Sequence, residues 1–443
     1  MKTFLRILIT SVIVLGFISA PMNNLVQRVA AAPANCADSL NPSTLYTVEV
    51  CITSPISGAT LSSNATITGT VSVLSGTNPG VQQIIFYLGS TYLLTSYASP
   101  YTFTLPINRY VDGTYTLSAQ ALMRDGFTSS VASISITLNT GTTTPPVNTN
   151  TFTPTSGRPA GGQPFVVAAT GDGAGGEPTT TSVTNLIAAH NPNLFLYLGD
   201  VYEQGSIAEF FNWYGNGGTF FDQFRAITDP TVGHHEYLTT DAAPYFYYWD
   251  NVPSYYSFNT NGWHFISLNS NGINIGGVGP NSPEYKWLQT DLATNSPLCT
   301  IAFYHHPLYS IGPEAPIAAM VDIWQLLAQN HVDIVLNGND HDYERWKPID
   351  GNGVRNLTGM TEFVLGTGGH SMQTVANSDV RVAYWTDANP AGFGALFLTL
   401  NPTNATFSYR SAVDGSVLDS GTIPCVDPSL PSVNYIYLPL VFH

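Results

Sequence analysis

The side chains that could bind a metal ion are concentrated in six short segments of the sequence, most of them directly after a run of apolar residues. The segments read GDG at 171–173, GDVY at 199–202, GHHE at 233–236, HHP at 305–307, NGNDH at 337–341 and YER at 343–345. Carboxylate oxygen combined with imidazole nitrogen suits zinc, manganese or iron, and the absence of cysteine from these segments argues against a soft-ligand site. One aspartate shared by two ions would hold them about 3.5–4 Å apart, as in two-metal hydrolases. The pattern therefore indicates a metal site built from several loops.

Buried strands are expected to position these segments. The runs PFVVAATGD, LFLYLGD, IAFYHHP and VDIVLNGND are almost continuously hydrophobic up to their polar ends, as in strands covered on both faces. Apolar residues at helical spacing lie at 183–190 and 317–324, and Ser282 followed by Pro283 is typical of a helix start. Alternating strands and helices predict a largely parallel sheet with ligands beyond the carboxyl ends of its strands. The hairpin signal Asn261-Gly262 adds antiparallel strands, so we expect an α/β class with mixed sheets.

The N-terminal part of the chain has a different residue pattern. Residues 46–139 alternate short β-prone runs with turns at the spacing of a β-sandwich, and they resemble the bacterial immunoglobulin-like repeats of exported enzymes. We expect this domain to act as a spacer or to contact a surface. The more specific alternative is that it binds a polymeric substrate. Residues 140–164 are rich in Thr, Pro and Gly and predict a solvated linker. The chain ends in a short apolar tail, 426–443.

The first residues predict export. Lys2 and Arg6 precede an apolar run, 7–20, and small residues follow, which is the pattern of a secretory signal peptide ending near residue 34. An uncleaved anchor is the alternative. The later cysteines are Cys36, Cys51, Cys299 and Cys425, and an even number in an exported chain favours disulfides. Domain order suggests Cys36–Cys51 and Cys299–Cys425, while two other pairings stay open.

The composition excludes nucleic acid as a structural partner. The formal net charge is −16, only 9 % of residues are charged, and 44 % are hydrophobic. A protein that follows a phosphate backbone needs clustered Lys and Arg, and the longest such cluster after the leader is Arg345 with Lys347. The same hydrophobic content is typical of a folded chain and not of a disordered one.

The ordered set of polar segments resembles the calcineurin-like metallophosphoesterases, particularly their purple acid phosphatase-like branch. The resemblance spans about 165–425. It implies an α/β metallophosphoesterase domain of two mixed β-sheets flanked by helices, and with the pattern of residues 46–139 the fold class becomes an immunoglobulin-like all-β sandwich followed by this domain.

The resemblance also implies a role for each matching residue. Asp172 and His341 would bind a first metal ion and Asp200 would bridge both ions. The second ion would be bound by His305 together with His234 and Asn339. His235 would contact the phosphate or protonate the leaving group. Second-shell and supporting roles would fall to Tyr343, Glu344 and Arg345.

The chain departs from the family pattern at three places. His234 stands where the family has asparagine and Asn339 where it has histidine, which we interpret as a compensated exchange. The family tyrosine after the bridging aspartate is one residue early: Tyr202 could ligate the first ion, or Glu203 could, or neither. The histidines that often follow the HxP segment are missing, which leaves His235 as the proton donor. His306 and His370 are further candidates for substrate contact.

Together these features predict an exported dinuclear phosphoesterase, acid phosphatase-like, that hydrolyses phosphomonoesters with a metal-activated water. The two ions would be Fe, Zn or Mn, and the partner a small phosphorylated substrate. The protein would be secreted or extracytoplasmic, with attachment to the cell surface left open. The alternative is a surface or adhesive protein whose phosphoesterase domain is a catalytically impaired scaffold.

Overall fold

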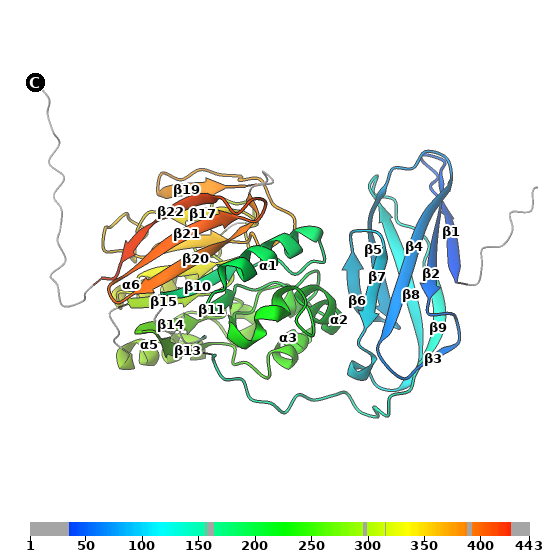
Figure 1. The fold of residues 1–443 in the computed structure, drawn as a ribbon, viewed down its shortest axis with the longest axis horizontal. Helices are drawn as coiled ribbons and strands as arrows, with labels where there is room; N and C mark the ends of the chain where they lie inside the picture. Colours follow the sequence, from blue (N-terminus) through cyan, green and yellow to red (C-terminus); the bar gives the residue numbers. More distant parts are fainter. Residues whose placement is uncertain are drawn as a thin grey trace, which may run out of the picture.

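The structure is a computed structural model that describes residues 35–155, 157, 164–295, 299–314, 316–387 and 392–426. An elongated β-sandwich lies beside a larger domain that combines sheets and helices (Figure 1). The predicted signal peptide, 1–34, lies outside the described residues, as do 158–163 of the predicted linker and all but the first residue of the predicted tail.

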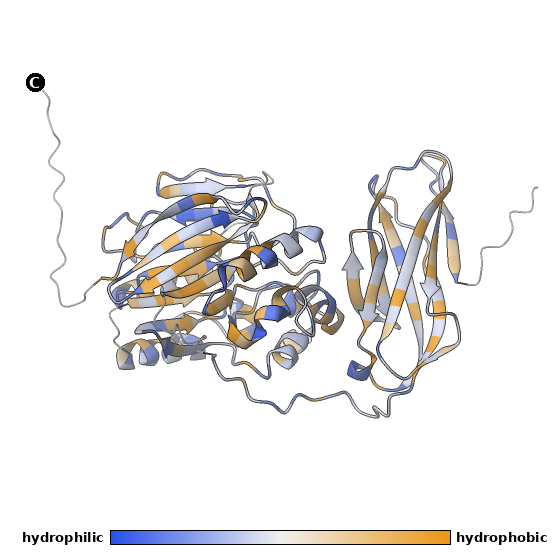
Figure 2. Cartoon of the chain, viewed as in Figure 1, coloured by the Kyte–Doolittle hydropathy of each residue, from blue (hydrophilic) through white to orange (hydrophobic). Residues whose placement is uncertain are grey.

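The N-terminal domain is a sandwich of two sheets with strand orders β1-β2-β4-β7 and β3-β9-β8-β5-β6. Along β8, buried side chains alternate with partly exposed ones, and Figure 2 shows the matching alternation of hydropathy along these strands. This is the pattern of a strand with one face on the core. The strands are β1 (Cys36–Leu40), β2 (Thr47–Ser54), β3 (Ala59–Leu61), β4 (Ala65–Ser75), β5 (Val81–Leu88), β6 (Thr91–Ser96), β7 (Tyr101–Leu105), β8 (Gly113–Met123) and β9 (Ala132–Leu138).

The second domain contains two mixed sheets, as expected. The first has the strand order β12-β11-β10-β20-β21-β22 and the second β13-β14-β15-β16-β18-β17-β19. The strands of the first sheet are β10 (Phe165–Thr170), β11 (Leu194–Tyr197), β12 (Thr228–Pro230), β20 (Gly394–Asn401), β21 (Asn404–Ser411) and β22 (Val417–Pro424). Those of the second sheet are β13 (Tyr256–Thr260), β14 (Trp263–Ser267), β15 (Cys299–Phe303), β16 (Ile334–Asn337), β17 (Tyr343–Trp346), β18 (Thr361–Leu365) and β19 (Val382–Thr386).

Each sheet contains one block of adjacent parallel strands. In the first sheet β10, β11 and β12 run in one direction, and in the second β14, β15, β16 and β18 do so. The carboxyl ends of parallel strands meet at one edge, so the loops that leave them can converge. The outer strands are antiparallel, including the hairpin β13–β14, which turns at Asn261 and Gly262 with φ of 50° and 79°. Two positive φ angles are what a two-residue hairpin of this kind requires.

The helices flank the sheets where the apolar spacing predicted them. The helical segments are α1 (Pro178–His190), α2 (Ile207–Glu209), α3 (Ala243–Tyr248), α4 (Gly272–Ile275), α5 (Pro283–Thr294) and α6 (Val321–Gln329). The Ser282 side chain caps α5 by accepting a hydrogen bond from the Tyr285 N–H. The pattern at 317–324 is only partly α-helical, because a 3₁₀ turn, Ala318–Met320, precedes α6. Among the described residues, no helix has the length and apolar character needed to cross a membrane.

Two disulfide bonds crosslink the chain. Cys36 is bonded to Cys51, its direct partner in the antiparallel pair β1–β2. Cys299, at the start of β15, is bonded to Cys425, just after β22. The second bond links the two sheets of the larger domain, and the pairing is the one that domain order suggests.

Candidate metal centre

The candidate metal ligands lie on loops that leave the carboxyl ends of five strands. Asp172 follows β10, Asp200 follows β11, the pair at 234–235 follows β12, His305 follows β15, and the segment 339–341 follows β16. All five strands belong to the parallel parts of the two sheets. The near-continuous apolar runs that predicted buried strands therefore also fix where their polar ends meet.

The backbone bends sharply at several ligand positions. Asp172, Asp200 and Asn339 have φ of 58°, 65° and 72°, a region that Asp and Asn tolerate better than most residues. Gly233 lies so close to the bridging candidate that an added Cβ would stand 2.0 Å from Asp200 Oδ1. Glycine next to the ligand is therefore required for close approach of the two loops.

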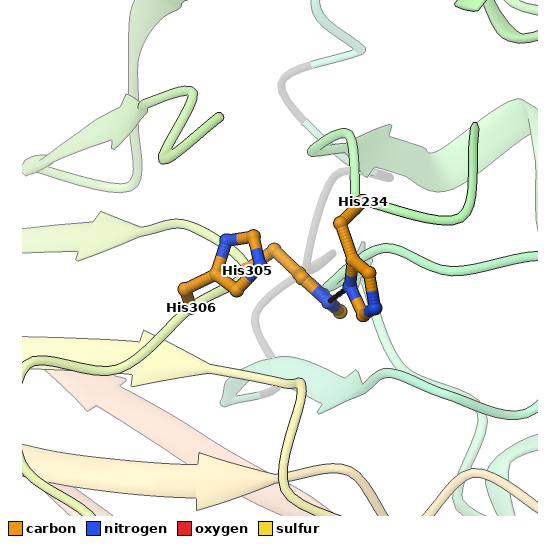
Figure 3. Close-up of side chains that lie close together, drawn as sticks. All are labelled: His234, His305 and His306. Atoms are coloured by element: carbon orange, nitrogen blue, oxygen red, sulfur yellow. Dashed lines mark hydrogen bonds between the residues drawn. The ribbon is translucent and has the colours of Figure 1, made fainter. Parts of the chain in front are cut away.

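One group of donor atoms converges on a single point. His234 Nδ1 and His305 Nε2 each lie 3.3 Å from Asp200 Oδ2. The two ring nitrogens are 3.1 Å apart, and Figure 3 shows the two rings facing each other with His306 alongside. Asp200 Oδ2 is buried and has no hydrogen-bond partner among the described residues.

A second group adjoins the first. The Tyr202 hydroxyl donates to Asp172 Oδ1 at 2.6 Å and lies 2.8 Å from His341 Nε2. Asp172, Asp200 and His305 each offer a ligand atom within 4.8 Å of the others. Asp200 thus stands between a set containing Asp172, His341 and Tyr202 and a set containing His305 and His234.

The histidine rings are oriented as ligands require. The Nδ1 atoms of His305 and His341 lie 2.9 Å from the Leu198 carbonyl and 2.7 Å from the Ser371 carbonyl. A carbonyl only accepts, so Nδ1 carries the proton and Nε2 faces the cluster with its lone pair. Anchoring of the outer ring nitrogen on a carbonyl is typical of metal-binding histidine.

The electrostatics of the site also fit cations. Burial lowers the pKa of His234 and of His341 to about 4, so both rings are neutral near pH 7. Burial opposes protonation of His305, yet the Asp200 carboxylate raises the pKa of that ring to about 10. Burial raises the pKa of Asp172 to about 7. Two neutral rings, two buried carboxylates and a His305 ring that holds a second proton against Asp200 make up a donor set that suits a metal ion, because a cation would replace the protons held there.

His235 lies beside the donor atoms with a fixed orientation. Its backbone N–H donates to Asp200 Oδ1 at 2.9 Å, and its Nδ1 donates to the Glu203 carbonyl at 2.6 Å. The other ring nitrogen, Nε2, lies 3.9 Å from Asp200 Oδ2. The ring therefore presents one exchangeable nitrogen to the space in front of the cluster.

The remaining candidates divide into those at the cluster and those behind it. His306 is bonded through Nδ1 to Ser270 Oγ, and its ring centroid lies 5.1 Å from that of His234. The His370 ring stacks on Tyr202 with centroids 4.0 Å apart. Glu203 directs its carboxylate to the Tyr97 hydroxyl. Of the three alternatives raised by the early tyrosine (Tyr202, Glu203 or neither as a ligand), the choice stays a prediction; the Tyr202 hydroxyl lies beside Asp172 and His341, whereas the Glu203 carboxylate faces Tyr97.

Asn339 and the YER segment hold the loops in place. The Asn339 backbone N–H donates to Asp172 Oδ2 at 3.0 Å. Glu344 accepts hydrogen bonds from the Ser310 hydroxyl and the Ile311 N–H, which ties down the loop after His305. Tyr343 and Arg345 turn away from the cluster, and both bond to Asp419 on β22.

Three residues near the centre received no role from sequence reasoning. Glu236 is buried, and its Oε2 accepts from the Gly233 N–H at 2.9 Å and from the Asp200 N–H at 3.3 Å. Its place in the GHHE segment was a signal that could have identified it. Glu177 pairs with His370, and Tyr97 reaches in from the sandwich domain. Neither residue could be assigned a role from the sequence, because the partner of each lies more than a hundred residues away along the chain.

Two parts of the chain match known protein families. Residues 49–119 match the family "Bacterial Ig domain" and residues 165–343 match the family "Calcineurin-like phosphoesterase". Over 167 residues the chain is 29 % identical to purple acid phosphatase 18 of Arabidopsis thaliana, which corresponds to 36 % of this chain and 37 % of that protein. The chain thus spans little more than a third of that curated relative.

Solved structures resemble the chain at low identity. A purple acid phosphatase, PPD1, from yellow lupin seeds (Lupinus luteus) has a TM-score of 0.49 at 17 % identity, covering 86 % of this chain and 80 % of that one. PhoD has a TM-score of 0.41 at 12 % identity and covers 88 % of each chain. The two family matches confirm the predicted order of an immunoglobulin-like domain and a calcineurin-like phosphoesterase domain, and the mixed sheets confirm the expected fold class.

Proposed function

We propose that the chain is a metal-dependent phosphoesterase that hydrolyses phosphomonoesters with a pair of metal ions. The observation that carries this proposal is the position of Asp200. Its buried carboxylate stands between two sets of oxygen and nitrogen donors, and one of its oxygens has no hydrogen-bond partner among the described residues. The calcineurin-like domain match supports the same reaction class.

Each set of donors suits one ion. Asp172, Tyr202 and His341 would hold the first ion, with Asp200 shared. His305, His234 and Asn339 would hold the second. Carboxylate, phenol and imidazole ligands suit Fe, Zn or Mn. When bound, such a pair of cations lowers the pKa of water and neutralises charge on the phosphoryl oxygens.

His235 would handle the proton of the leaving group. Because Nδ1 is held by the Glu203 carbonyl, the ring cannot turn away, and Nε2 stays in front of the donor cluster. A proton on Nε2 can pass to the alcohol oxygen as the ester bond breaks, which is general acid catalysis. His306 and His370 flank the same space and would orient the phosphate.

We also propose that the protein works outside the cytoplasm, with a signal peptide over 1–34, a sandwich domain over 46–139, a linker over 140–164, a catalytic domain over 165–425 and a tail over 426–443. The two disulfides support an oxidising compartment. A small phosphorylated molecule is the expected substrate, and the sandwich domain is free to contact a surface or polymer.

Metal analysis combined with phosphatase assays tests the proposal. The purified chain should hold two metal ions and hydrolyse 4-nitrophenyl phosphate with added Mn, Zn or Fe. Asp200→Asn should lower both metal content and turnover, the latter more than about 100-fold, without unfolding the domain. Asp229→Asn is the matched control, since Asp229 is also a buried aspartate but lies within β12, where it accepts a hydrogen bond from the Thr155 N–H. Less than one ion per chain and no turnover would favour the alternative, an impaired scaffold that binds surfaces.

A further inference from the structure

A cavity of about 860 Å³ opens directly beside the candidate metal centre. His234 and His306 form its inner wall, and both belong to the histidine cluster of the centre. The loop around α4 forms the outer wall, with Ile273 at its edge, and Ile317 closes the other side. A group attached to a phosphate at the centre would therefore have this cavity next to it.

The lining of this cavity is uncharged and largely apolar. It contains no Lys, Arg, Asp or Glu among the described residues. Two of its polar side chains are engaged within the protein, since Ser270 Oγ lies 2.8 Å from His306 Nδ1 and Asn271 Nδ2 donates to the Gly233 carbonyl. Tyr237 and Asn274 are the other uncharged polar side chains of the lining besides the two histidines. Leu238 and Ile273 are 60 % and 97 % exposed, and both line the same cavity, so they add two exposed apolar side chains to one site.

We infer that this cavity receives the alcohol part of the phosphoester, and that this part is an uncharged apolar group, an aryl ring or an alkyl chain. The inference rests on the proposed function, because His234 lies in both the metal centre and the cavity wall. A charged alcohol would need an opposite charge in the wall, and the described lining residues supply none. The volume lies in the range of sites that hold small molecules.

Chain length gives the sharpest test. Each methylene that is fully transferred from water to such a wall strengthens binding about fourfold. Octylphosphonate and ethylphosphonate carry the same phosphorus head and no hydrolysable ester bond, so calorimetry on the metal-loaded protein compares their affinities directly. We expect octylphosphonate to bind at least about 10-fold more tightly.

Two substitutions separate the cavity from general surface effects. Ile273→Asp places a charge at the cavity edge on an almost fully exposed residue, so it leaves the fold intact and should remove most of the chain-length preference. Ile56→Asp is the matched control, because Ile56 is 76 % exposed on the sandwich domain. Equal affinity for the two phosphonates, or equal behaviour of the two variants, overturns the inference. Turnover of octyl phosphate is measured separately: its absence counts against the proposed function, while a chain-length preference in binding still supports the cavity.

A second inference rests on different contacts, those between the two domains. Tyr97, just after β6 of the sandwich, donates its hydroxyl hydrogen to Glu203 Oε1, and its ring centroid lies 5.9 Å from that of His370. The neighbouring Tyr92 donates to Glu209 Oε1 at 2.6 Å. The sandwich domain thus contacts the loop that follows the bridging candidate, Asp200.

The two residues that Tyr97 contacts, Glu203 and His370, are themselves in contact with residues of the candidate metal centre. The Glu203 carbonyl holds His235 Nδ1, and the His370 ring stacks on Tyr202, whose hydroxyl contacts Asp172. We propose that the immunoglobulin-like domain supplies a positioning residue, Tyr97, which fixes Glu203 and His370 beside the metal centre. The domain would then be part of the active site rather than only a spacer.

Paired tyrosine variants test this proposal in the full chain. Tyr97→Phe and Tyr92→Phe each remove one hydroxyl from the same domain boundary, so a purely structural effect should be similar in both. We expect only Tyr97→Phe to weaken orthophosphate binding by the metal-loaded protein, about 10-fold. We also expect only Tyr97→Phe to move the ring-nitrogen chemical shifts of His235 and His370 in histidine-labelled, metal-free protein. Equal results for the two variants in both measurements overturn the proposal.

Discussion

At the scale of single residues, the exchange at positions 234 and 339 bears on how a second ion would be held in the proposed metal centre. His234 brings Nδ1 to within 3.3 Å of Asp200 Oδ2. Asn339 bonds through its backbone to Asp172 and has a left-handed backbone conformation. If the exchange is compensated, the imidazole would come from the loop after β12 and the amide from the loop after β16, and the number of donor residues would be kept.

Swapping the two residues tests whether the exchange is compensated. His234→Asn alone should lower metal content, because it removes an imidazole from the cluster. Asn339→His alone should also do so, because it places a larger ring where a loop is already tightly bent. The double variant should hold more metal than either single variant, as measured by elemental analysis of the purified proteins. Equal losses in all three variants would reject compensation.

Asp229 gives a pH prediction that is independent of metal. Burial raises the pKa of this carboxyl to about 7. In the unfolded chain it ionises near pH 3.8, so between these values the folded state holds a proton that the unfolded state has lost. The contribution of Asp229 to folding stability is therefore fully present below about pH 4, and it is lost as the pH rises towards 7.

Asp229→Asn removes this dependence because the amide does not titrate. The stability of the variant relative to the native protein should rise by at most about 1.4 kcal/mol for each pH unit between pH 4 and 7. Thermal unfolding of both proteins across this range measures the difference. The amide oxygen can still accept from the Thr155 N–H, so hydrogen bonding there is retained. Parallel curves for the two proteins would contradict the prediction.

Sequence reasoning brought the donor residues together because each sits at the end of an apolar strand. Asp172, Asp200 and His305 were expected at one edge of a sheet, and the structure places their ligand atoms within 4.8 Å of one another. The contact of Tyr97 with Glu203 could not be predicted in this way, since it depends on how two separate domains pack. A spacing rule acts along one chain segment and carries no information about such packing.

At the scale of elements, the sequence pattern predicted strands best where both faces of the strand are buried. The runs that became β10, β11, β15 and β16 were visible as continuous apolar segments. The order of strands was not visible: β17 pairs with β18 and β19 through long loops, and β20 inserts next to β10 from a distant part of the sequence. Strand order depends on long-range packing that no local pattern records.

The disulfide between Cys299 and Cys425 should stabilise the domain without acting on the site. It joins β15 to the end of β22 across 126 residues, and closing a loop of this length restricts the unfolded chain strongly. Replacing both cysteines by serine should lower the free energy of unfolding by about 2–5 kcal/mol. Chemical denaturation measures this loss, and metal content at low temperature should be unchanged. A variant as stable as the native protein would show that the bond adds nothing.

At the scale of the whole molecule, the two domains share hydrogen bonds between main chain and side chain. The Asn212 amide accepts from the Thr104 N–H at 2.8 Å and donates to the Thr104 carbonyl at 2.9 Å. It thereby satisfies the edge of β7 as a neighbouring strand would. Asn148, in the predicted linker, donates to Asp250 at 2.9 Å and adds a further contact.

Removing the Asn212 amide should loosen this arrangement. Asn212→Ala leaves both backbone groups of Thr104 without their partner, which costs about 1–3 kcal/mol when such groups are buried. We expect calorimetry of the variant to resolve two unfolding transitions, one for each domain. In the native protein these two transitions should lie closer together. Asn330→Ala is the control, because the Asn330 amide donates to Leu326 within the larger domain alone. Identical traces for both variants would show that the amide does not couple the domains.

The bond between Cys299 and Cys425 also fixes where the chain leaves the larger domain. Cys299 begins β15, whereas His305 follows the far end of the same strand, so residue 426 departs from the edge opposite the ligand loops. A dye, resin or carrier protein joined at residue 426 itself would therefore sit on that opposite edge. Tethered in this way, the protein would keep its substrate entrance turned outward, towards the surrounding liquid.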